Sequence, residues 1–291
     1  MKHAVRNGTI IPEEEAVLPV TRREVFFNFS VYESLKVLRG TALFVSEHLD
    51  RLFDSARILE LSHPFSREEI GGSIDALVAK DELAEATIKL LVVGGEEPLY
   101  IVYSTSLPAY PEEYYRRGAR AITYPGERIM PRAKSNCLLL NYMASREASR
   151  RDALEALLVD RYGKATEGTR SNLFAVRKGE LITAEEDVLY GVTRKHILEI
   201  AEEQGLPVRF EKIDTEELRA GSYSELFISS TSMGAIPIGE LDGVSLVSEL
   251  PGAPDTAYSR GETLFPAAAL IHRELKRGEK RETERRRAPY A

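Results

Sequence analysis

Three short segments, in a fixed order, constrain this chain of 291 residues more than any other feature. Lys134 comes first, just before the apolar run Leu138-Leu139-Leu140. The second segment extends from Thr166 through Glu167 to Phe174, and its ends have the composition of short strands. The third, Gly191-Val192-Thr193-Arg194, stands where a helical pattern begins. The spacing predicts a mixed α/β fold that brings an amine, a carboxylate and a helix start together.

These groups match the needs of an enzyme that uses pyridoxal phosphate. A lysine bonds the aldehyde carbon of the cofactor, and an acid keeps the pyridine nitrogen protonated, which strengthens electron withdrawal. The free N–H groups and positive dipole end of a helix bind the phosphate. Taken singly, each segment is ambiguous. Lys134 alone reads as a surface lysine, Glu167 as a solvated turn residue, and Thr193 as an ordinary N-cap.

Composition excludes several other classes of protein. The net charge of −7 disfavours nucleic acid or an anionic membrane surface as a partner. The chain has a single cysteine, Cys137, which excludes an intramolecular disulfide and a metal site built from several cysteines. We expect no metal. We find neither an apolar stretch of about 18 residues nor a signal-peptide core near the N-terminus, so a cytoplasmic protein is expected.

The pattern changes along the chain in a way that predicts two α/β domains. Residues 1–110 form the expected small domain, 111–117 a proline-bounded linker, and 118–291 a large cofactor-binding domain with a charged tail. The tail, from Lys276 onward, reads as a frayed helix end that is mobile. Regular elements expected in the first domain are strands at Phe26–Phe29, Val31–Val37, Thr87–Val93 and Tyr100–Ser104, and helices at Glu47–Leu61 and Ser66–Lys80, the latter capped by Ser66.

Six segments, in order, resemble the fold-type IV (class IV) pyridoxal phosphate aminotransferases, the family of D-alanine and branched-chain aminotransferases. The resemblance covers about residues 20–245. Besides the three segments above, they are the strand Val31–Val37, the helix Glu47-His48-Leu49-Asp50-Arg51-Leu52, and the turn Ser229-Ser230-Thr231-Ser232. The resemblance implies a two-domain fold-type IV enzyme that forms at least a homodimer.

The resemblance also assigns roles residue by residue. Lys134 is the catalytic lysine, and Glu167 the acid at the pyridine nitrogen. Arg51, which by itself reads as a surface arginine, is a phosphate ligand. The remaining implied cofactor contacts are Leu189, Val192, Thr193, Ser230 and Thr231, although the serine-threonine turn is also consistent with a plain polar turn. Tyr32, Lys89, Ser232 and Met233 are candidate substrate contacts; the alternatives are a core tyrosine for Tyr32 and a solvated strand lysine for Lys89.

Substrate markers of the family are partly missing. Leu139 stands where branched-chain enzymes usually have a tyrosine, and Thr87-Ile88-Lys89 replaces their Tyr-x-Arg. The loop at Gly94–Pro98 lacks the arginine and histidine with which D-alanine enzymes hold the substrate carboxylate. We therefore predict transfer of an amino group between an amino acid, of the D or branched-chain type, and a 2-oxo acid. Two alternatives stay open: a lyase similar to aminodeoxychorismate lyase, and a non-catalytic binding protein that keeps the fold.

Overall fold

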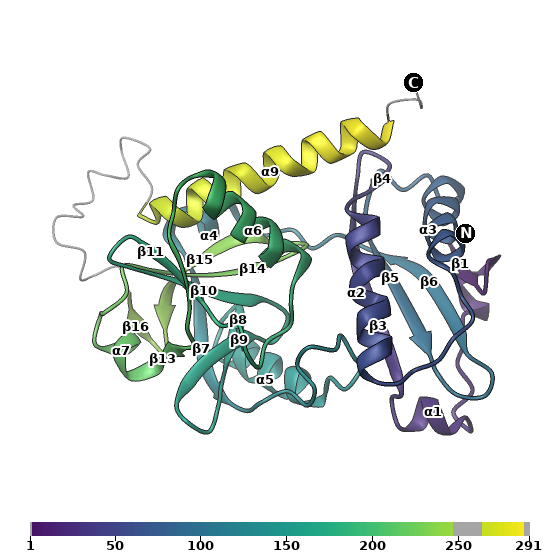
Figure 1. Cartoon of the computed structure of the whole chain (residues 1–291), viewed down its shortest axis with the longest axis horizontal. Coiled ribbons are helices and arrows are strands. Elements are labelled where there is room, and N and C mark those ends of the chain that lie inside the picture. Colours follow the sequence, from purple (N-terminus) through teal and green to yellow (C-terminus); the bar gives the residue numbers. More distant parts are fainter. Residues whose placement is uncertain (1, 247–263, 288–291) are drawn as a thin grey trace. The chain divides into compact units, whose positions relative to one another are not determined.

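The computed structural model describes residues 2–246 and 264–287. The chain forms two compact units, each with its own hydrophobic core (Figure 1). Unit 1 comprises residues 1–108, 132–137 and 278–291, and unit 2 comprises residues 109–131 and 138–277. The segment that carries Lys134 therefore belongs to unit 1, although its neighbours on both sides in sequence belong to unit 2. No helix of the described residues is long and apolar enough to cross a membrane.

Unit 1 is built on a six-stranded antiparallel sheet with the order β2-β1-β6-β5-β3-β4. The neighbouring strands β3 and β5 are paired along their whole length, from Ser30 opposite Val93 to Leu38 opposite Glu85. Side chains on one sheet face form an apolar core with two helices, α2 and α3 (Figure 1). The elements are β1 (His3–Arg6), β2 (Thr9–Pro12), η1 (Glu13–Glu15), α1 (Arg23–Phe26), β3 (Ser30–Leu38), β4 (Thr41–Ala42), α2 (Val45–Ile58), α3 (Arg67–Lys80), β5 (Glu85–Val93) and β6 (Leu99–Thr105).

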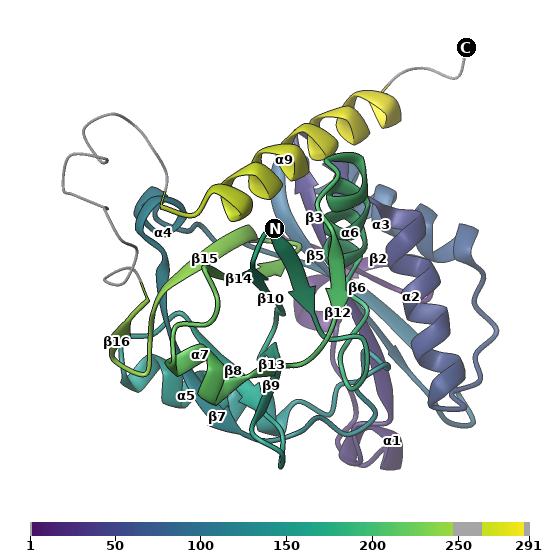
Figure 2. The same ribbon diagram turned by 60° about the vertical axis from the view of Figure 1, so that its left-hand side comes forward.

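Unit 2 contains a ten-stranded sheet whose middle closes on itself. The order runs β10-β14-β15-β7-β8-β9, and β9 pairs again with β10 at Glu167 and Asn172. All six strands, which Figure 2 labels, contribute apolar side chains to one core. The elements are α4 (Glu112–Arg117), β7 (Ala119–Pro125), α5 (Leu139–Arg150), β8 (Glu155–Val159), β9 (Lys164–Gly168), β10 (Asn172–Arg177), β11 (Glu180–Thr183), α6 (Val192–Glu203), β12 (Val208–Phe210), β13 (Ile213–Asp214), α7 (Thr215–Arg219), β14 (Glu225–Ser230), β15 (Gly234–Leu241), β16 (Val244–Ser245) and α9 (Pro266–Arg287).

Two local expectations are wrong. Phe26–Phe29 is not a strand: α1 ends at Phe26, and Phe26 and Phe27 are 76% and 66% exposed, so these two rings do not face a core. Phe29 alone packs against the core of unit 1. The expected mobile tail from Lys276 is instead a continuous helix as far as Arg287. Its last turns are held within unit 1, because buried Lys36 donates to Glu279 at 2.9 Å and Arg286 pairs with Asp75. Residues 288–291 of the tail lie outside the described residues.

The helix predicted at Ser66–Lys80 is confirmed with its cap. The Ser66 hydroxyl oxygen accepts a hydrogen bond from the N–H of Glu69 at 3.1 Å, which satisfies one of the free donors at the helix start. The strands predicted at Thr87–Val93 and Tyr100–Ser104 are also confirmed, as β5 and β6. Residues with strong strand preference fill both strands, which pair antiparallel from Thr87 opposite Thr105 to Val93 opposite Leu99.

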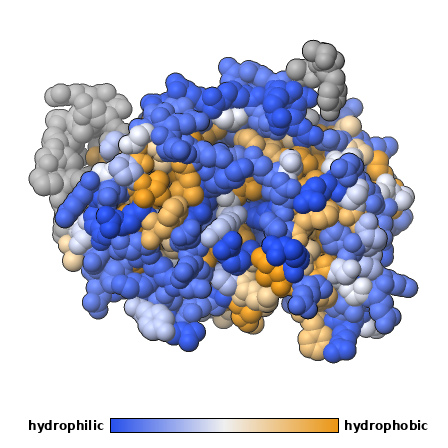
Figure 3. Space-filling model, viewed as in Figure 1, coloured by the Kyte–Doolittle hydropathy of each residue, from blue (hydrophilic) through white to orange (hydrophobic). Residues whose placement is uncertain are grey.

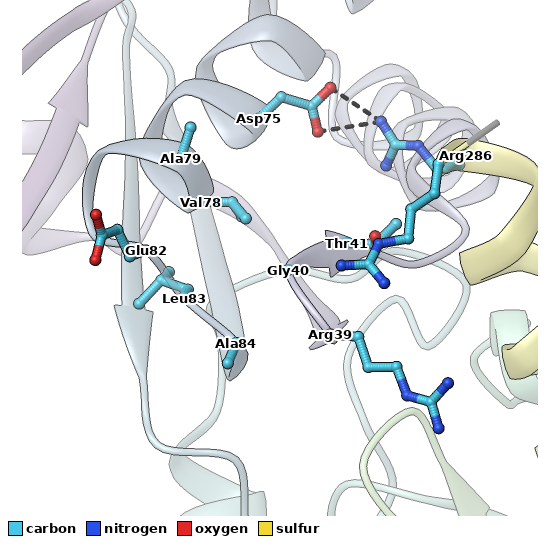
Figure 4. A pocket seen from close by; sticks show the side chains of 11 residues that line it. Arg39, Gly40, Thr41, Asp75, Val78, Ala79, Glu82, Leu83, Ala84 and Arg286 are labelled. Atoms are coloured by element: carbon cyan, nitrogen blue, oxygen red, sulfur yellow. Dashed lines mark hydrogen bonds and ion pairs between the residues drawn. The ribbon is translucent and has the colours of Figure 1, made fainter. Parts of the chain in front are cut away.

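An open hollow of about 670 Å³ lies in unit 1, beside the turn between β3 and β4. Figure 4 shows Asp75 and Arg286 paired at its edge and Val78 and Leu83 on its wall. None of the predicted site residues lines this hollow. The displayed face in Figure 3 is mostly hydrophilic, with patches of apolar side chains between the polar ones.

Candidate active site

Lys134 is fixed by its backbone in unit 1. Its N–H donates to the Ser55 hydroxyl at 2.9 Å, and its carbonyl accepts from the N–H of Tyr32 at 3.0 Å. A further bond, from the N–H of Asn136 to the carbonyl of Ser30 at 3.0 Å, continues this pairing beside β3. The Lys134 ammonium nitrogen lies 4.5 Å from the centre of the Tyr32 ring. The structure thus brings together the predicted catalytic lysine and the predicted substrate residue Tyr32.

Lys89 lies on the same face of the unit 1 sheet as Tyr32. Ser34, two residues after Tyr32 on β3, is directly opposite Lys89 on β5, and side chains two apart on a strand share a face. The Lys89 ammonium donates to the Ser34 hydroxyl at 2.7 Å. The shared sheet face of Tyr32 and Lys89 therefore supports the prediction that both contact the substrate.

Arg51 is not a surface arginine. Its Nε and one terminal nitrogen donate to the two carboxylate oxygens of Glu33 at 2.7 and 2.8 Å, a bidentate ion pair. His48 binds the same carboxylate through Nδ1 at 2.8 Å. The side chain of Glu33 is wholly buried, and that of Arg51 is 12% exposed. The Ser55 hydroxyl donates to the carbonyl of Arg51 at 2.7 Å, so one serine links the Arg51 turn to Lys134.

Electrostatics in this cluster follow from burial and charge. Burial alone would raise the pKa of the Glu33 carboxyl, but the charge of Arg51 and the hydrogen bonds from Arg51 and His48 outweigh it and hold that pKa well below its usual range. Burial lowers the pKa of His48 more than Glu33 raises it, which favours the neutral imidazole. His48 Nε2 has no hydrogen-bond partner within residues 2–246 and 264–287, although it is buried.

Glu167 is held on both carboxylate oxygens in unit 2. Arg128 donates to Oε1 at 3.0 Å, and the N–H of Leu189 donates to Oε2 at 3.1 Å. The side chains of Glu167 and Arg128 are only 5% and 8% exposed. A carboxylate has about four lone-pair positions, so it can accept hydrogen bonds from several donors at once. Glu167 lies on β9, and the turn that follows this strand is supported by buried Glu155, which accepts from Thr169 and Ser171.

The start of α6 forms the anion-binding end of unit 2. Gly191, not Thr193, is the N-cap, and no side chain caps the helix. Thr193 is the second residue of the helix, so its expected role as N-cap is wrong, because the chain becomes helical two residues earlier. A Cβ on Gly191 would collide with the Asn172 amide oxygen, and Asn172 itself donates to the carbonyl of Leu189 at 2.7 Å. Glycine therefore lets Asn172 support the helix start without covering its N–H groups.

The loop between β14 and β15 offers a second set of donors in the same unit. Thr231, Ser232 and Met233 connect Ser230 to its strand partner Gly234. Ser229 pairs with Asn172 across the sheet, and its buried hydroxyl has no hydrogen-bond partner in the described part of the chain. An unpaired buried hydroxyl is costly unless a ligand or water completes it. This orphaned donor and the uncapped α6 start fit a phosphate group.

Sequence reasoning missed several residues of these two clusters. Arg128 follows Gly126-Glu127 in an aperiodic stretch, and nothing in the pattern predicts its pairing with Glu167. Glu33 had a detectable signal, since it shares a strand face with the apolar residues Val31 and Leu35, which are buried. A carboxylate at a buried strand position requires a cationic partner. Asn172 and Ser55 act through hydrogen bonds to backbone groups, which the sequence does not reveal.

Comparison with known proteins agrees with this geometry. The family model of class IV aminotransferases matches residues 30–241. The D-alanine aminotransferase of Listeria monocytogenes serotype 1/2a (strain 10403S) is 32% identical, over 86% of this chain and 91% of its own. The branched-chain-amino-acid aminotransferase of Pseudomonas aeruginosa is 32% identical, over 81% and 84%. The branched-chain amino acid aminotransferase of T.th., solved with pyridoxamine 5'-phosphate, superposes with a TM-score of 0.82 at 25% identity, over 97% and 96%.

The chain belongs to the class IV aminotransferases. It is a pyridoxal phosphate-dependent aminotransferase with the fold-type IV architecture, so the mixed α/β fold, the family and the cofactor expected from the sequence are confirmed. The relatives are named as aminotransferases, which favours transamination over the lyase alternative. The roles of the individual site residues stay predictions.

Proposed function

We propose that this enzyme transfers an amino group between an amino acid and a 2-oxo acid, with Lys134 and Glu167 acting on one cofactor. The observation that carries the assignment is the fixation of buried Glu167 by Arg128 and by the N–H of Leu189. Bound pyridoxal phosphate supplies an electron sink for the bond to the substrate Cα. Glu167 accepts a hydrogen bond from the protonated pyridine nitrogen and so favours that form of the ring.

The roles of the remaining residues follow from their geometry. Lys134 Nζ would take the proton from the substrate Cα and deliver it to the C4′ carbon of the cofactor, acting first as a general base and then as a general acid. Arg51, oriented by Glu33, binds the phosphate. The start of α6, at Val192 and Thr193, and the loop at Ser230 and Thr231 bind the same group, while Leu189 contacts the ring side.

The substrate proposal rests on unit 1 and on the relatives. Tyr32 and Lys89 share a sheet face, and a lysine ammonium there supplies a cation for the substrate carboxylate. Ser232 and Met233 are the proposed contacts from unit 2. Since the relatives are named D-alanine and branched-chain aminotransferases, we propose that the donor is a D-amino acid or a branched-chain amino acid.

Titration of the holoenzyme with single amino acids tests this proposal. The visible absorption band of the bound cofactor is recorded while D-alanine, L-leucine and other D- and L-amino acids are added without an oxo acid. We expect bleaching by one enantiomeric series and recovery on addition of a 2-oxo acid. Bleaching by no amino acid would contradict transamination.

Replacement of the catalytic lysine provides the matched test. We expect Lys134→Ala to abolish turnover while the protein stays folded by circular dichroism. Lys195→Ala removes a mostly exposed lysine of α6 that forms a surface pair with Glu199 at 3.8 Å, and it should leave turnover unchanged. Normal turnover of Lys134→Ala would contradict the assignment.

We also propose that two copies of the chain associate through unit 2. Leu139, Tyr142 and Met143 are 74%, 64% and 43% exposed, and their spacing places them on one side of α5. An exposed apolar stripe of this kind suits a two-fold interface, in which the same surface meets itself. The cytoplasmic location expected from the sequence stays a prediction.

A further inference from the structure

The short helix α4 and Tyr110, which precedes its capping residue, lie against the loop between β14 and β15. The Tyr115 hydroxyl donates to the carbonyl of Met233 at 2.9 Å. The hydroxyls of Tyr110 and Ser232 are hydrogen-bonded at 3.1 Å. Both tyrosine rings pack against the apolar core of unit 2. Residues 111–117 read as a linker in the sequence, yet this segment and Tyr110 reach the proposed phosphate-binding loop.

The residue that follows the loop has an unusual backbone conformation. The three loop residues are followed by Gly234 at φ +70°, a left-handed conformation that glycine adopts without strain. A Cβ there would also lie 2.8 Å from His272 Nδ1. His272, on α9, accepts a hydrogen bond from the N–H of Ala235 at 3.3 Å, just beyond the loop.

His272 and Tyr115 support each other. Their ring centres are 4.4 Å apart, so the imidazole packs on the ring whose hydroxyl binds Met233. The far end of α4 is also anchored, because Gly118 approaches the backbone of Gly239 on β15 so closely that no Cβ would fit. The helix is therefore tied to β15 at the start of the strand and again at its bulge, between Ile238 and Glu240.

These contacts use some polar groups of the loop and leave others unused. Within residues 2–246 and 264–287, no hydrogen bond uses the N–H of Thr231 or Ser232 or the Thr231 hydroxyl. Tyr115 binds a carbonyl oxygen of the loop, an acceptor that would repel an anion. Because Tyr115 holds that carbonyl, the two N–H groups and the Thr231 hydroxyl can bind the ligand.

We propose that Tyr115 and Tyr110, with His272 packed on Tyr115, are positioning residues that hold the Thr231–Met233 loop in its phosphate-binding conformation. The inference rests on the proposed role of this loop in cofactor binding. Neither tyrosine is assigned a contact with the cofactor. Their effect is preorganisation: without them, the ordering of the loop is added to the free-energy cost of binding the phosphate.

The test compares two ligands that differ only in the phosphate. Dissociation constants of pyridoxal 5'-phosphate and of pyridoxal are measured on the full-length chain after cofactor removal, with inorganic phosphate as a competitor. Since one hydrogen bond contributes about 0.5–1.5 kcal/mol, we expect Tyr115→Phe to weaken pyridoxal 5'-phosphate roughly three- to tenfold. Binding of pyridoxal should stay unchanged, and inorganic phosphate should compete less well.

Tyr223→Phe is the matched control. Tyr223 packs against the same core, and its hydroxyl donates at 3.1 Å to Glu217, which lies on α7 rather than on the loop. This variant should leave both dissociation constants unchanged. Tyr110→Phe, which removes the second contact, should reproduce the selective loss in milder form and guards against misfolding of Tyr115→Phe.

Several outcomes would overturn the inference. Equal weakening of both ligands would indicate general loosening of unit 2. Unchanged binding of pyridoxal 5'-phosphate in both variants would contradict a role in positioning the loop for the phosphate. A raised KM for the amino acid with unchanged cofactor binding would contradict it too, because the effect would then lie at the proposed substrate contacts Ser232 and Met233. Failure of the unsubstituted protein to bind pyridoxal 5'-phosphate would overturn the proposed function as well. Binding by the unsubstituted protein therefore distinguishes failure of this inference from failure of the proposed function.

Discussion

Glu33 has no exposed surface, and two cationic or potentially cationic side chains converge on its carboxylate. Its replacement by glutamine keeps the shape but removes the charge, which deprives the nearly buried guanidinium of Arg51 of this counter-charge. Breaking a buried pair in this way costs about 3–5 kcal/mol. We therefore expect Glu33→Gln to lower the free energy of unfolding by about 3 kcal/mol, as measured by urea denaturation.

Asp54→Asn is the control for this prediction. Asp54 pairs with Arg57 on the same helix, but both side chains are mostly exposed, at 66% and 74%. Exposed pairs contribute little, so the change should be about 0.5 kcal/mol or less. Equal losses in the two variants would show that Glu33 is not specially stabilised by its buried partners.

The lowered pKa of Glu33 also predicts how the stability of the protein depends on pH. The pKa of Glu33 is lowered in the folded state, so its stabilising contribution is complete above the unfolded value of 4.5 and is lost as the pH falls below it. The difference in unfolding free energy between the unsubstituted protein and Glu33→Gln should therefore shrink between about pH 5 and pH 3. Urea unfolding of both proteins at a series of pH values measures this difference. A difference that stays constant with pH would contradict the lowered pKa of Glu33.

At the scale of single elements, the start of α6 depends on a glycine for space. Gly191→Ala must displace the Asn172 amide, which then loses its hydrogen bond to Leu189 and disturbs the helix start. We expect the dissociation constant of pyridoxal 5'-phosphate to rise about tenfold or more, since a loss of about 1.4 kcal/mol corresponds to a factor of ten. Cofactor titration followed by visible absorption provides the measurement.

A glycine inside α3 supplies the opposite case. A Cβ on Gly72 would meet nothing within 4 Å, and the residue is in a regular helix. Gly72→Ala should therefore stabilise the protein by about 0.5–1 kcal/mol through helix propensity alone, without changing cofactor affinity. If Gly191→Ala behaved like Gly72→Ala, the proposed packing of the α6 start would be wrong.

The elements also show what the sequence does and does not predict. The capped helix α3 and the strands β5 and β6 follow from periodicity and a capping residue, because those signals are local. The strand expected at Phe26–Phe29 fails because strand preference describes a half-buried surface, and these rings are largely exposed. The continuation of α9 to Arg287 could not be predicted, since it depends on a buried pair between Glu279 and Lys36, far apart in sequence.

The residues of the candidate site also divide into those that the sequence predicts and those that only the structure reveals. Lys134, Glu167 and Thr193 are found from residue type and spacing, and the resemblance assigns their roles. Arg128 and Asn172 are found only in the structure, because each works through a contact with a distant segment. Arg51 is intermediate: its helical position suggests the surface, and only the burial of Glu33 shows why it turns inward.

For the whole molecule, the remaining question is assembly. The apolar stripe of α5 predicts that the protein behaves in solution as a particle of about twice its chain mass of 32.6 kDa. Tyrosine side chains near the centre of an interface often dominate its energy, and a buried unpaired carboxylate there is strongly unfavourable. Tyr142→Glu should therefore give a monomer in light scattering coupled to size exclusion.

A second exposed tyrosine makes the result specific. Tyr162 is 77% exposed, in the turn between β8 and β9 and outside the α5 stripe. Tyr162→Glu adds the same charge to unit 2 and should leave the dimer intact. Dissociation by both variants would indicate a nonspecific charge effect, and a dimer that survives Tyr142→Glu would place the interface elsewhere. If the monomer formed by Tyr142→Glu also loses cofactor, the second copy contributes to the site; if it keeps the cofactor, one chain holds it alone.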